Sequence, residues 1–168
     1  LVERVGTTRE LGSLLEIRVP ELIAYQDAAY AREYVDFVKK VHDAEHDAVP
    51  GETRLSEAVA RFLFKLMAYK DEYEVGRLHL ITGLSDQLAR RWPGGFTMAY
   101  HLHPPLIRAL GMRRKLRFGA WITAVFRLLA ALRGLRGTPF DIFGYTSVRR
   151  LERALVGEYR ALIEKALT

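Results

Sequence analysis

Apolar and polar positions repeat with the period of a helix across residues 56–91. On a helical wheel at about 100° per residue, the apolar side chains share one stripe: Phe62, Leu66, Tyr69, Tyr73, Leu80 and Leu84. Charged residues such as Glu57 and Lys65 fall on the opposite side. The pattern predicts one long helix over residues 56–91 that packs against a core.

Three charged residues of this stretch, Lys70, Glu74 and Arg77, fall within the apolar half of the wheel. Burying an ionised group is costly unless it is paired and hydrogen-bonded. Residues three and four apart on a helix touch, so these three can pair with one another. We expect a poorly exposed charge cluster. Either it is a structural ion-pair network, or its remaining positive charge marks an anion-binding or docking site.

The other apolar patterns also predict helices. Pro20 suits the first turn of a helix over residues 21–46. Residues 118–132 are apolar nearly all round, which predicts the most buried helix. Thr146 suits the N-cap of a last helix that ends near residue 167. Its expected core stripe is Val148, Leu151, Leu155, Tyr159, Leu162 and Ala166.

Between these helices, the aromatic and apolar residues 96–105 predict one short extended segment. The aromatic residues of 140–145 are expected to fold into the core. The predicted fold class is therefore mainly α: a bundle of four or so long helices with a loop-rich basic region and one short strand or hairpin. We expect residues 1–168 to form a single domain taken from a longer polypeptide, with residues 1–19 as a linker or a partner-pairing segment.

Composition excludes several kinds of chemistry. The chain has no cysteine, which excludes disulfides, thiolate catalysis and cysteine-ligated zinc or iron–sulfur clusters within it. No apolar run reaches the roughly 18 residues that a membrane-spanning helix needs, so no membrane partner is expected. We expect a cytoplasmic location.

The net charge of +6 is unevenly distributed. Residues 1–83 carry 11 Lys/Arg against 15 Asp/Glu, a net of −4, whereas residues 84–168 carry 15 against 5, a net of +10. A basic half of this kind favours an anionic partner. The candidate anion-binding or partner-binding residues lie in two basic loops: Arg113, Arg114, Lys115, Arg117, Arg133 and Arg136.

Histidine patterns give two further candidate sites. His42, Glu45 and His46 share one face of a predicted helix and have a spacing that allows metal binding, although residues near a polar helix end are usually just solvated. His101 and His103 alternate onto one side of the predicted strand and form a candidate polar site. We predict no metal site and no catalytic residue in this chain.

Five motifs occur in the same order as in the C-terminal region of indolepyruvate ferredoxin oxidoreductases. They occupy residues 67–75 (Met-Ala-Tyr-Lys-Asp-Glu-Tyr-Glu-Val), 100–106 (Tyr-His-Leu-His-Pro-Pro-Leu), 118–121 (Phe-Gly-Ala-Trp), 132–139 (Leu-Arg-Gly-Leu-Arg-Gly-Thr-Pro) and 143–146 (Phe-Gly-Tyr-Thr). The chain resembles that region over roughly residues 24–167. It departs from the pattern at Gly76 and His103, where alanine is expected, and the second departure weakens any inherited two-histidine site.

The resemblance implies a parent enzyme that oxidatively decarboxylates aryl pyruvates with thiamine diphosphate, Mg and iron–sulfur clusters. This chain lacks the Gly-Asp-Gly diphosphate motif and has no cysteine. We therefore expect no cofactor here, and an accessory domain that packs on or gates the catalytic domains. The alternative is a free-standing basic helical module that binds an acidic protein partner or, less in keeping with the apolar stripes, nucleic acid.

Overall fold

A computed structural model describes residues 9–102 and 114–168. As predicted, the fold is mainly helical, and it contains one small antiparallel hairpin. The chain was expected to form a single domain, but it divides into two compact units. Unit 1 combines Leu1–Asp71 with Arg133–Thr168, and unit 2 is the continuous segment Glu72–Leu132.

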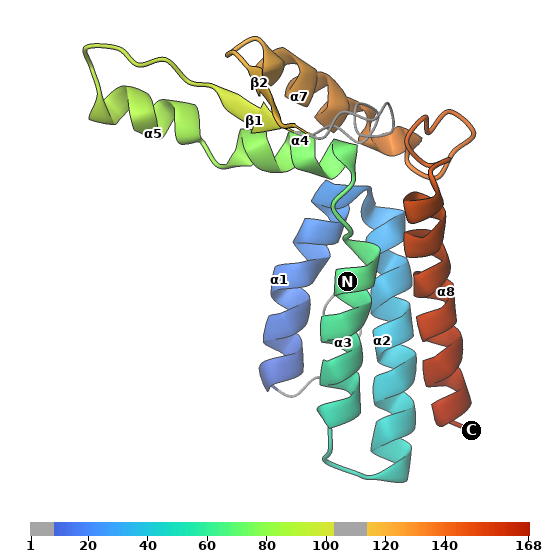
Figure 1. Ribbon diagram of the computed structural model, residues 1–168. Helices are drawn as coiled ribbons and strands as arrows, with labels where there is room; N and C mark the ends of the chain where they lie inside the picture. The colour runs from blue at the N-terminus through green and yellow to red at the C-terminus, as the bar shows by residue number, and fades with distance from the viewer. Residues whose placement is uncertain (1–8, 103–113) are drawn as a thin grey trace. The chain divides into compact units, whose positions relative to one another are not determined.

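Four helices build unit 1: α1 (Arg9–Tyr25), α2 (Ala28–Ala48), α3 (Arg54–Met67) and α8 (Ser147–Ala166). Helices α1, α2 and α3 pack against one another, and α8 packs against α3 (Figure 1). Their shared core is built from fully buried aliphatic and aromatic side chains, among them Leu11, Leu15, Leu22, Tyr34, Val35, Val38, Val41, Val59, Leu63 and Met67. Burying such side chains is the main favourable term in folding.

The single helix predicted over residues 56–91 is wrong, because the chain forms three helices there. Helix α3 ends at Met67, α4 spans Glu72–Ile81, and α5 spans Leu84–Arg91. Gly83 separates the last two with φ +55°, a left-handed conformation that favours glycine. The apolar period continues across both breaks, so the pattern could not reveal them.

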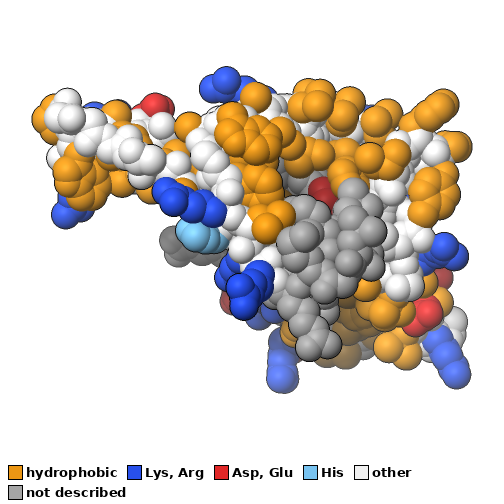
Figure 2. All heavy atoms as spheres, turned by 45° about the horizontal axis from the view of Figure 1, so that its top comes forward, with side chains coloured by type: hydrophobic (Ala, Val, Ile, Leu, Met, Phe, Trp, Pro, Cys, Tyr) orange, Lys and Arg blue, Asp and Glu red, His pale blue; other side chains and the backbone are white. Residues whose placement is uncertain are grey.

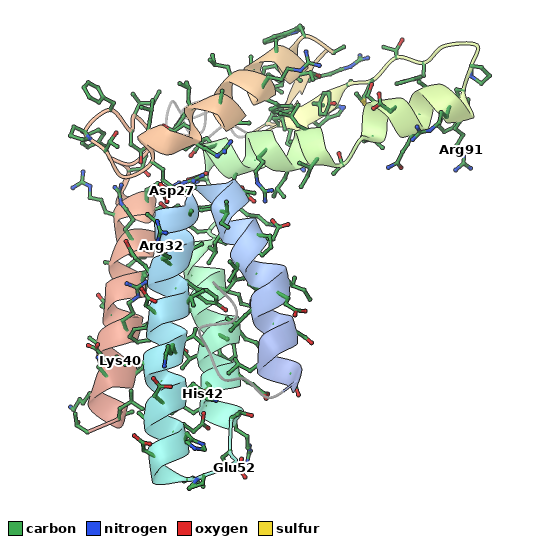
Figure 3. The ribbon with its side chains drawn as sticks, turned by 180° about the vertical axis from the view of Figure 1, so that it is seen from behind. Asp27, Arg32, Lys40, His42, Glu52 and Arg91 are labelled. Atoms are coloured by element: carbon green, nitrogen blue, oxygen red, sulfur yellow. The ribbon has the colours of Figure 1, made fainter. Side chains whose placement is uncertain are left out.

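The helix predicted to start near Pro20 also differs. Pro20 lies inside α1, and the break comes at Asp27 instead. The Asp27 carboxylate accepts a hydrogen bond from the backbone N–H of Tyr30 at 2.8 Å, which caps the start of α2 (Figure 3). A strong capping residue therefore set the boundary that proline had been expected to set.

Unit 2 contains α4, α5, α7 (Ile122–Ala131) and a hairpin of β1 (Tyr100–Leu102) and β2 (Leu116–Phe118). Helices α4 and α7 pack closely at Gly76, where an added Cβ would lie 3.0 Å from both the Phe126 oxygen and the Leu129 Cβ. The ring of His79 stacks on that of Phe126, with 4.6 Å between their centroids. This close approach leaves little room for a side chain at position 76.

Helix α7 is not the most buried helix, which corrects the sequence prediction. Its buried residues are Ile122 and Phe126, whereas Leu128 is 58% exposed and Trp121, just before it, is 62% exposed. The first four residues of the predicted helix, 118–121, belong to β2 and the turn after it. An apolar sequence therefore does not by itself produce a buried helix.

The last helix begins as predicted. Thr146 is the N-cap of α8, and its hydroxyl accepts a hydrogen bond from the Arg149 N–H. The predicted core stripe is largely wrong, because Val148, Leu151, Leu155 and Leu162 are exposed. The residues that pack on the core are Val156, Tyr159, Ile163 and Leu167. No helix in the described ranges is long and apolar enough to span a bilayer.

Candidate functional site

A buried arginine ties the two chain segments of unit 1 together. Arg136 donates from Nε to Oδ2 of Asp71 at 2.5 Å and from Nη2 to Oδ1 at 2.9 Å. Its Nη1 donates to the backbone oxygen of Tyr25, and its guanidinium lies 3.7 Å from the centroid of the Tyr25 ring. Both charged side chains of this pair are 3% exposed. The three groups form a closed network at the ends of α1 and of the 3-10 helix Leu132–Leu135.

The electrostatics of this network hold its charges in place. Burial disfavours the charged form of Arg136, but the hydrogen bond and charge of Asp71 outweigh it and raise the pKa of the guanidinium. Burial, with the negative charge of Asp71 as a second cause, raises the pKa of Tyr25 above its usual range. Arg136 therefore remains a paired cation inside unit 1. Its predicted role as a partner-binding residue is wrong.

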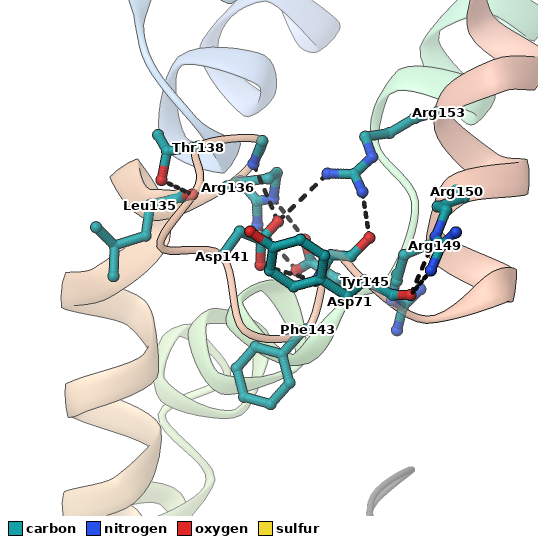
Figure 4. Close-up of polar contacts among 12 residues, drawn as sticks. Asp71, Leu135, Arg136, Thr138, Asp141, Phe143, Tyr145, Arg149, Arg150 and Arg153 are labelled. Carbon is teal, nitrogen blue, oxygen red and sulfur yellow. Dashed lines mark hydrogen bonds and ion pairs between the residues drawn. The ribbon is translucent and has the colours of Figure 1, made fainter.

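A second carboxylate, Asp141, closes the loop that follows Arg136 (Figure 4). Its Oδ2 accepts the N–H of Gly137 at 3.0 Å, and its Oδ1 accepts the N–H of Gly144 at 3.1 Å. Gly137 has φ +77°, and a Cβ at Gly144 would lie 2.5 Å from Asp141 Oδ2. The glycine-rich turn does present N–H groups to an anion, as sequences of this kind can. That anion is the chain's own Asp141.

Further polar contacts fix the same loop. The Tyr145 hydroxyl donates to the oxygen of Pro139 at 2.7 Å, and Arg150 donates to the oxygen of Tyr145 at 2.8 Å. Arg153 donates to the oxygen of Gly144 (Figure 4). Because these bonds join the loop to the first turns of α8, the conformation of residues 136–146 is well defined.

The prediction that the aromatic residues of this loop fold into the core is wrong for Phe140 and Tyr145, which are exposed, whereas Phe143 is half-buried. Phe140 is 74% exposed and Ile142 is 69% exposed. Along the chain they are followed by Tyr145 and by the exposed apolar side chains of α8. We call this set the loop–helix surface, and it consists of Phe140, Ile142, Tyr145, Val148, Leu151 and Leu155. Large exposed apolar patches on folded proteins usually mark interaction sites.

The predicted charge cluster on α4 is partly present. Glu74 is buried and accepts two hydrogen bonds from Arg77, each 2.8 Å long, from Nε and from Nη2. This confirms the expectation that Glu74 and Arg77 are paired with each other and poorly exposed. Lys70 is exposed and precedes α4, so its predicted burial is wrong. The break between α3 and α4 moves it off the helical wheel on which the prediction rested.

The remaining predicted basic residues that the structure describes are exposed. Arg114, Lys115 and Arg117 lie on or just before β2, and Arg133 lies in the 3-10 helix. His101 is exposed and is the register partner of Arg117 across the hairpin. His103 and Arg113 lie outside the described residues. On the face displayed in Figure 2, exposed hydrophobic side chains are widespread, and Lys and Arg side chains lie at several points around them.

His42, Glu45 and His46, whose spacing would allow metal binding, make other interactions in the structure. Glu45 accepts the N–H groups of Leu55 and Ser56 at 2.7 and 2.8 Å, and also the Ser56 hydroxyl. Although burial works in the opposite direction, these bonds lower the pKa of Glu45. Glu45 thus caps the start of α3, while His42 and His46 stack on each other with 6.4 Å between ring centroids. Within residues 9–102 and 114–168, no three potential ligands form a metal-binding group.

Sequence reasoning missed the residues that organise unit 1, namely Asp71, Asp141 and Tyr25. Asp71 is separated from Arg136 by 65 positions, so no local spacing signalled the pair. For Asp141, a local sequence signal does exist. It lies four residues after Gly137 and three before Gly144, an arrangement in which a short carboxylate can bond the backbone of its own turn.

A family model described as "Family of unknown function (DUF6537)" matches residues 11–168. A search of curated proteins and a search of solved structures found no match. The match covers nearly the whole chain, including α1 and both segments of unit 1. The chain therefore belongs to the family of unknown function DUF6537.

Proposed function

We propose that this chain is a non-catalytic helical accessory domain of a cytoplasmic, thiamine-diphosphate-dependent indolepyruvate ferredoxin oxidoreductase. The five ordered motifs that resemble the C-terminal region of those enzymes support the proposal. In it, α1, α2, α3 and α8 act as a bundle of four long helices that docks on the catalytic domains.

The loop–helix surface is the observation that carries the docking role. Exposing an apolar side chain to water costs free energy, at about 25 cal/mol per Å² of apolar area. Here, the Asp141 carboxylate accepts a hydrogen bond from the backbone, Tyr145 and Arg150 donate to it, and these bonds fix the backbone that exposes the apolar side chains. A rigid apolar surface of this kind loses little conformational entropy on binding, which favours association.

The charge around the loop–helix surface indicates the kind of surface that it meets. Arg150 is exposed at the edge of this surface, and its guanidinium donates to the backbone oxygen of Tyr145. Interfaces commonly combine an apolar centre with a polar rim, and arginine is enriched in them. The partner is therefore an apolar patch of the catalytic domains bordered by carboxylates.

The sequence argues against catalysis by this chain itself. It has neither a diphosphate-binding Gly-Asp-Gly motif nor a cysteine, so it offers no ligands for the cofactors that carry out the reaction. The buried carboxylates Asp71, Glu45 and Asp141 bond to groups of the chain itself. Calorimetry of the isolated chain should accordingly detect no binding of thiamine diphosphate or of a 2-oxoacid, and stoichiometric micromolar binding would contradict the proposal.

The experiment uses the full-length polypeptide that contains this chain, assayed for indolepyruvate-dependent ferredoxin reduction. The double variant Phe140→Ser/Leu151→Ser should lower turnover or subunit assembly about tenfold or more, because truncating two central interface residues commonly costs more than 1.4 kcal/mol. The isolated variant chain should keep its helix content and its unfolding midpoint. These readouts separate docking from folding.

A matched control replaces two apolar residues of unit 1 that are exposed elsewhere, Ile17 on α1 and Phe62 on α3, which are 69% and 52% exposed. The variant Ile17→Ser/Phe62→Ser should leave turnover and assembly within about twofold of the original. Equal effects of the two double variants would contradict docking through the loop–helix surface. Absence of oxidoreductase activity in the full-length polypeptide would contradict the enzyme assignment.

A further inference from the structure

Unit 2 holds the whole net charge of the chain. Residues 72–132 carry 9 Lys/Arg against 3 Asp/Glu, a net of +6, which leaves 17 of each, and a net of zero, for unit 1. Arg77 is paired with Glu74. The other basic residues of unit 2 that the structure describes form no ion pair, and they are Arg90, Arg91, Arg114, Lys115, Arg117 and Arg127. Their fields therefore add instead of cancelling.

The hairpin concentrates part of this charge on one face. In both strands the middle residue is exposed and its neighbours are half-buried, so His101 and Arg117 share the outer face and are register partners. Lys115 lies two residues before Arg117, and strand alternation gives it the same face. Arg114 is exposed next to it. We call these four residues the basic hairpin face.

Exposed apolar side chains occur in the same unit. Trp121 follows β2 closely, is 62% exposed, and packs edge-on against Phe118 with 5.8 Å between ring centroids. Leu128 of α7 and Leu84 of α5 are also exposed, at 58% and 46%. Tryptophan and arginine are the residues most enriched at the energetic centres of protein interfaces.

We propose that the basic hairpin face, together with Trp121, binds an acidic segment of a protein through arginine–carboxylate pairs. This assigns unit 2 a partner of its own, beyond the docking of unit 1. An arginine fork matches a carboxylate with two parallel hydrogen bonds, and Arg114 and Arg117 supply two such forks. Trp121, three residues after β2, adds an exposed flat apolar surface close to the hairpin in the chain.

The exposed leucines favour a protein over a nucleic acid as the partner. A nucleic acid would use the basic groups and the tryptophan ring, but a phosphate backbone has no apolar groups to cover Leu84 and Leu128. A protein partner carries both carboxylates and apolar side chains, so it suits both kinds of exposed residue in unit 2. An acidic protein segment and a nucleic acid can also be distinguished by titrating the chain with each of them separately.

The test exploits the position of the tryptophans. The chain has two, Trp92 and Trp121, and both lie in unit 2. In a Trp92→Phe background, the fluorescence of Trp121 alone reports binding next to the hairpin. The chain is titrated at low salt with an oligoglutamate peptide and, separately, with an oligouridylate of equal charge. We expect saturable oligoglutamate binding that weakens as salt screens the charges.

The decisive variant is Arg114→Gln/Lys115→Gln/Arg117→Gln. Its matched control, Arg32→Gln/Arg54→Gln/Lys65→Gln, removes two arginines and one lysine that are exposed in unit 1. We expect the hairpin variant to weaken oligoglutamate binding about tenfold or more, and the control to stay within about twofold. Equal losses of oligoglutamate binding in the two variants would mean that only the net charge matters, which would overturn the proposal. Tighter binding of oligouridylate, or no binding of oligoglutamate, would also overturn it.

Discussion

The two units differ in how they use their arginines. In unit 1, Arg136 is buried against Asp71, and Arg149, Arg153 and Arg160 each have a carboxylate partner. In unit 2, within the described residues, Arg77 has a carboxylate partner and the remaining basic side chains are exposed without one. Net charge follows this division, with zero in unit 1 and +6 in unit 2.

The difference shows that composition alone does not say what an arginine does. A buried arginine needs a carboxylate to offset its desolvation, and it then contributes to the stability of one fold. An exposed and unpaired arginine contributes little to stability and remains available for recognition. Four substitutions test this contrast through the stability of the fold.

Asp71→Ala should cause the largest loss of stability. It leaves the buried guanidinium of Arg136 without its bidentate partner, which commonly costs about 3–5 kcal/mol. Urea unfolding followed by far-UV circular dichroism measures the loss. The double variant Asp71→Ala/Arg136→Met should recover much of it, because no buried charge remains. A loss below about 1 kcal/mol for the single variant would show that Arg136 is not dependent on Asp71.

Glu74→Ala tests the corresponding pair in unit 2. Glu74 is buried and accepts hydrogen bonds from Nε and Nη2 of Arg77. Its removal should therefore cost about 3 kcal/mol in the free energy of unfolding. Asp86→Ala is the matched control, since Asp86 is an exposed acid of the same unit. That control should change stability by less than about 0.5 kcal/mol. Similar effects of the two would contradict the burial of the Glu74 pair.

Glu45→Gln should have an intermediate effect and a distinctive pH dependence. The pKa of Glu45 is lowered in the folded chain, so its contribution is complete above the ordinary glutamate pKa of 4.5. It is then lost as pH falls through the lower folded value. We expect a loss of about 1–2 kcal/mol near neutral pH that shrinks in acid. A loss independent of pH, in denaturation curves measured across this range, would exclude the charge as its cause.

The triple variant Arg114→Gln/Lys115→Gln/Arg117→Gln should have the smallest effect on stability. These side chains are exposed and unpaired, so unfolding in urea should change by less than about 0.5 kcal/mol. A larger loss would mean that the hairpin uses them for folding, and the contrast between the two units would then fail.

Local signals predicted a good part of the fold. Thr146 marked the start of α8, and the aromatic residues near position 100 marked the hairpin, because a cap and a strand depend on neighbours in sequence. The Glu74–Arg77 pair was found for the same reason, since its members are three positions apart. Arg114 and Lys115 are exposed, as a basic loop requires, whereas Arg117, expected in the same loop, lies in β2.

Predictions that needed distant contacts were wrong. Arg133 and Arg136 have the same local setting, and Asp71, far away in sequence, makes one of them buried while the other is exposed. The apolar stripe of α8 could not reveal which side meets α3, because Val156 and Ile163 form a second stripe beside it. The apolar periodicity of residues 56–91 continues unchanged across the two breaks that separate α3, α4 and α5. Only tertiary packing resolves such cases.

The bond between Asp71 and Arg136 joins the two points at which the chain leaves and re-enters unit 1. Unit 2 is thus an insertion whose ends are fastened together by its host. The entropic cost of closing such a loop rises only slowly with its length. Insertions of very different size can therefore occupy this position without disturbing the host helices. Replacing residues 72–132 by a short glycine–serine linker should leave a unit 1 that still folds, which makes the insertion a natural boundary for shortening, exchanging or transplanting this part of the protein.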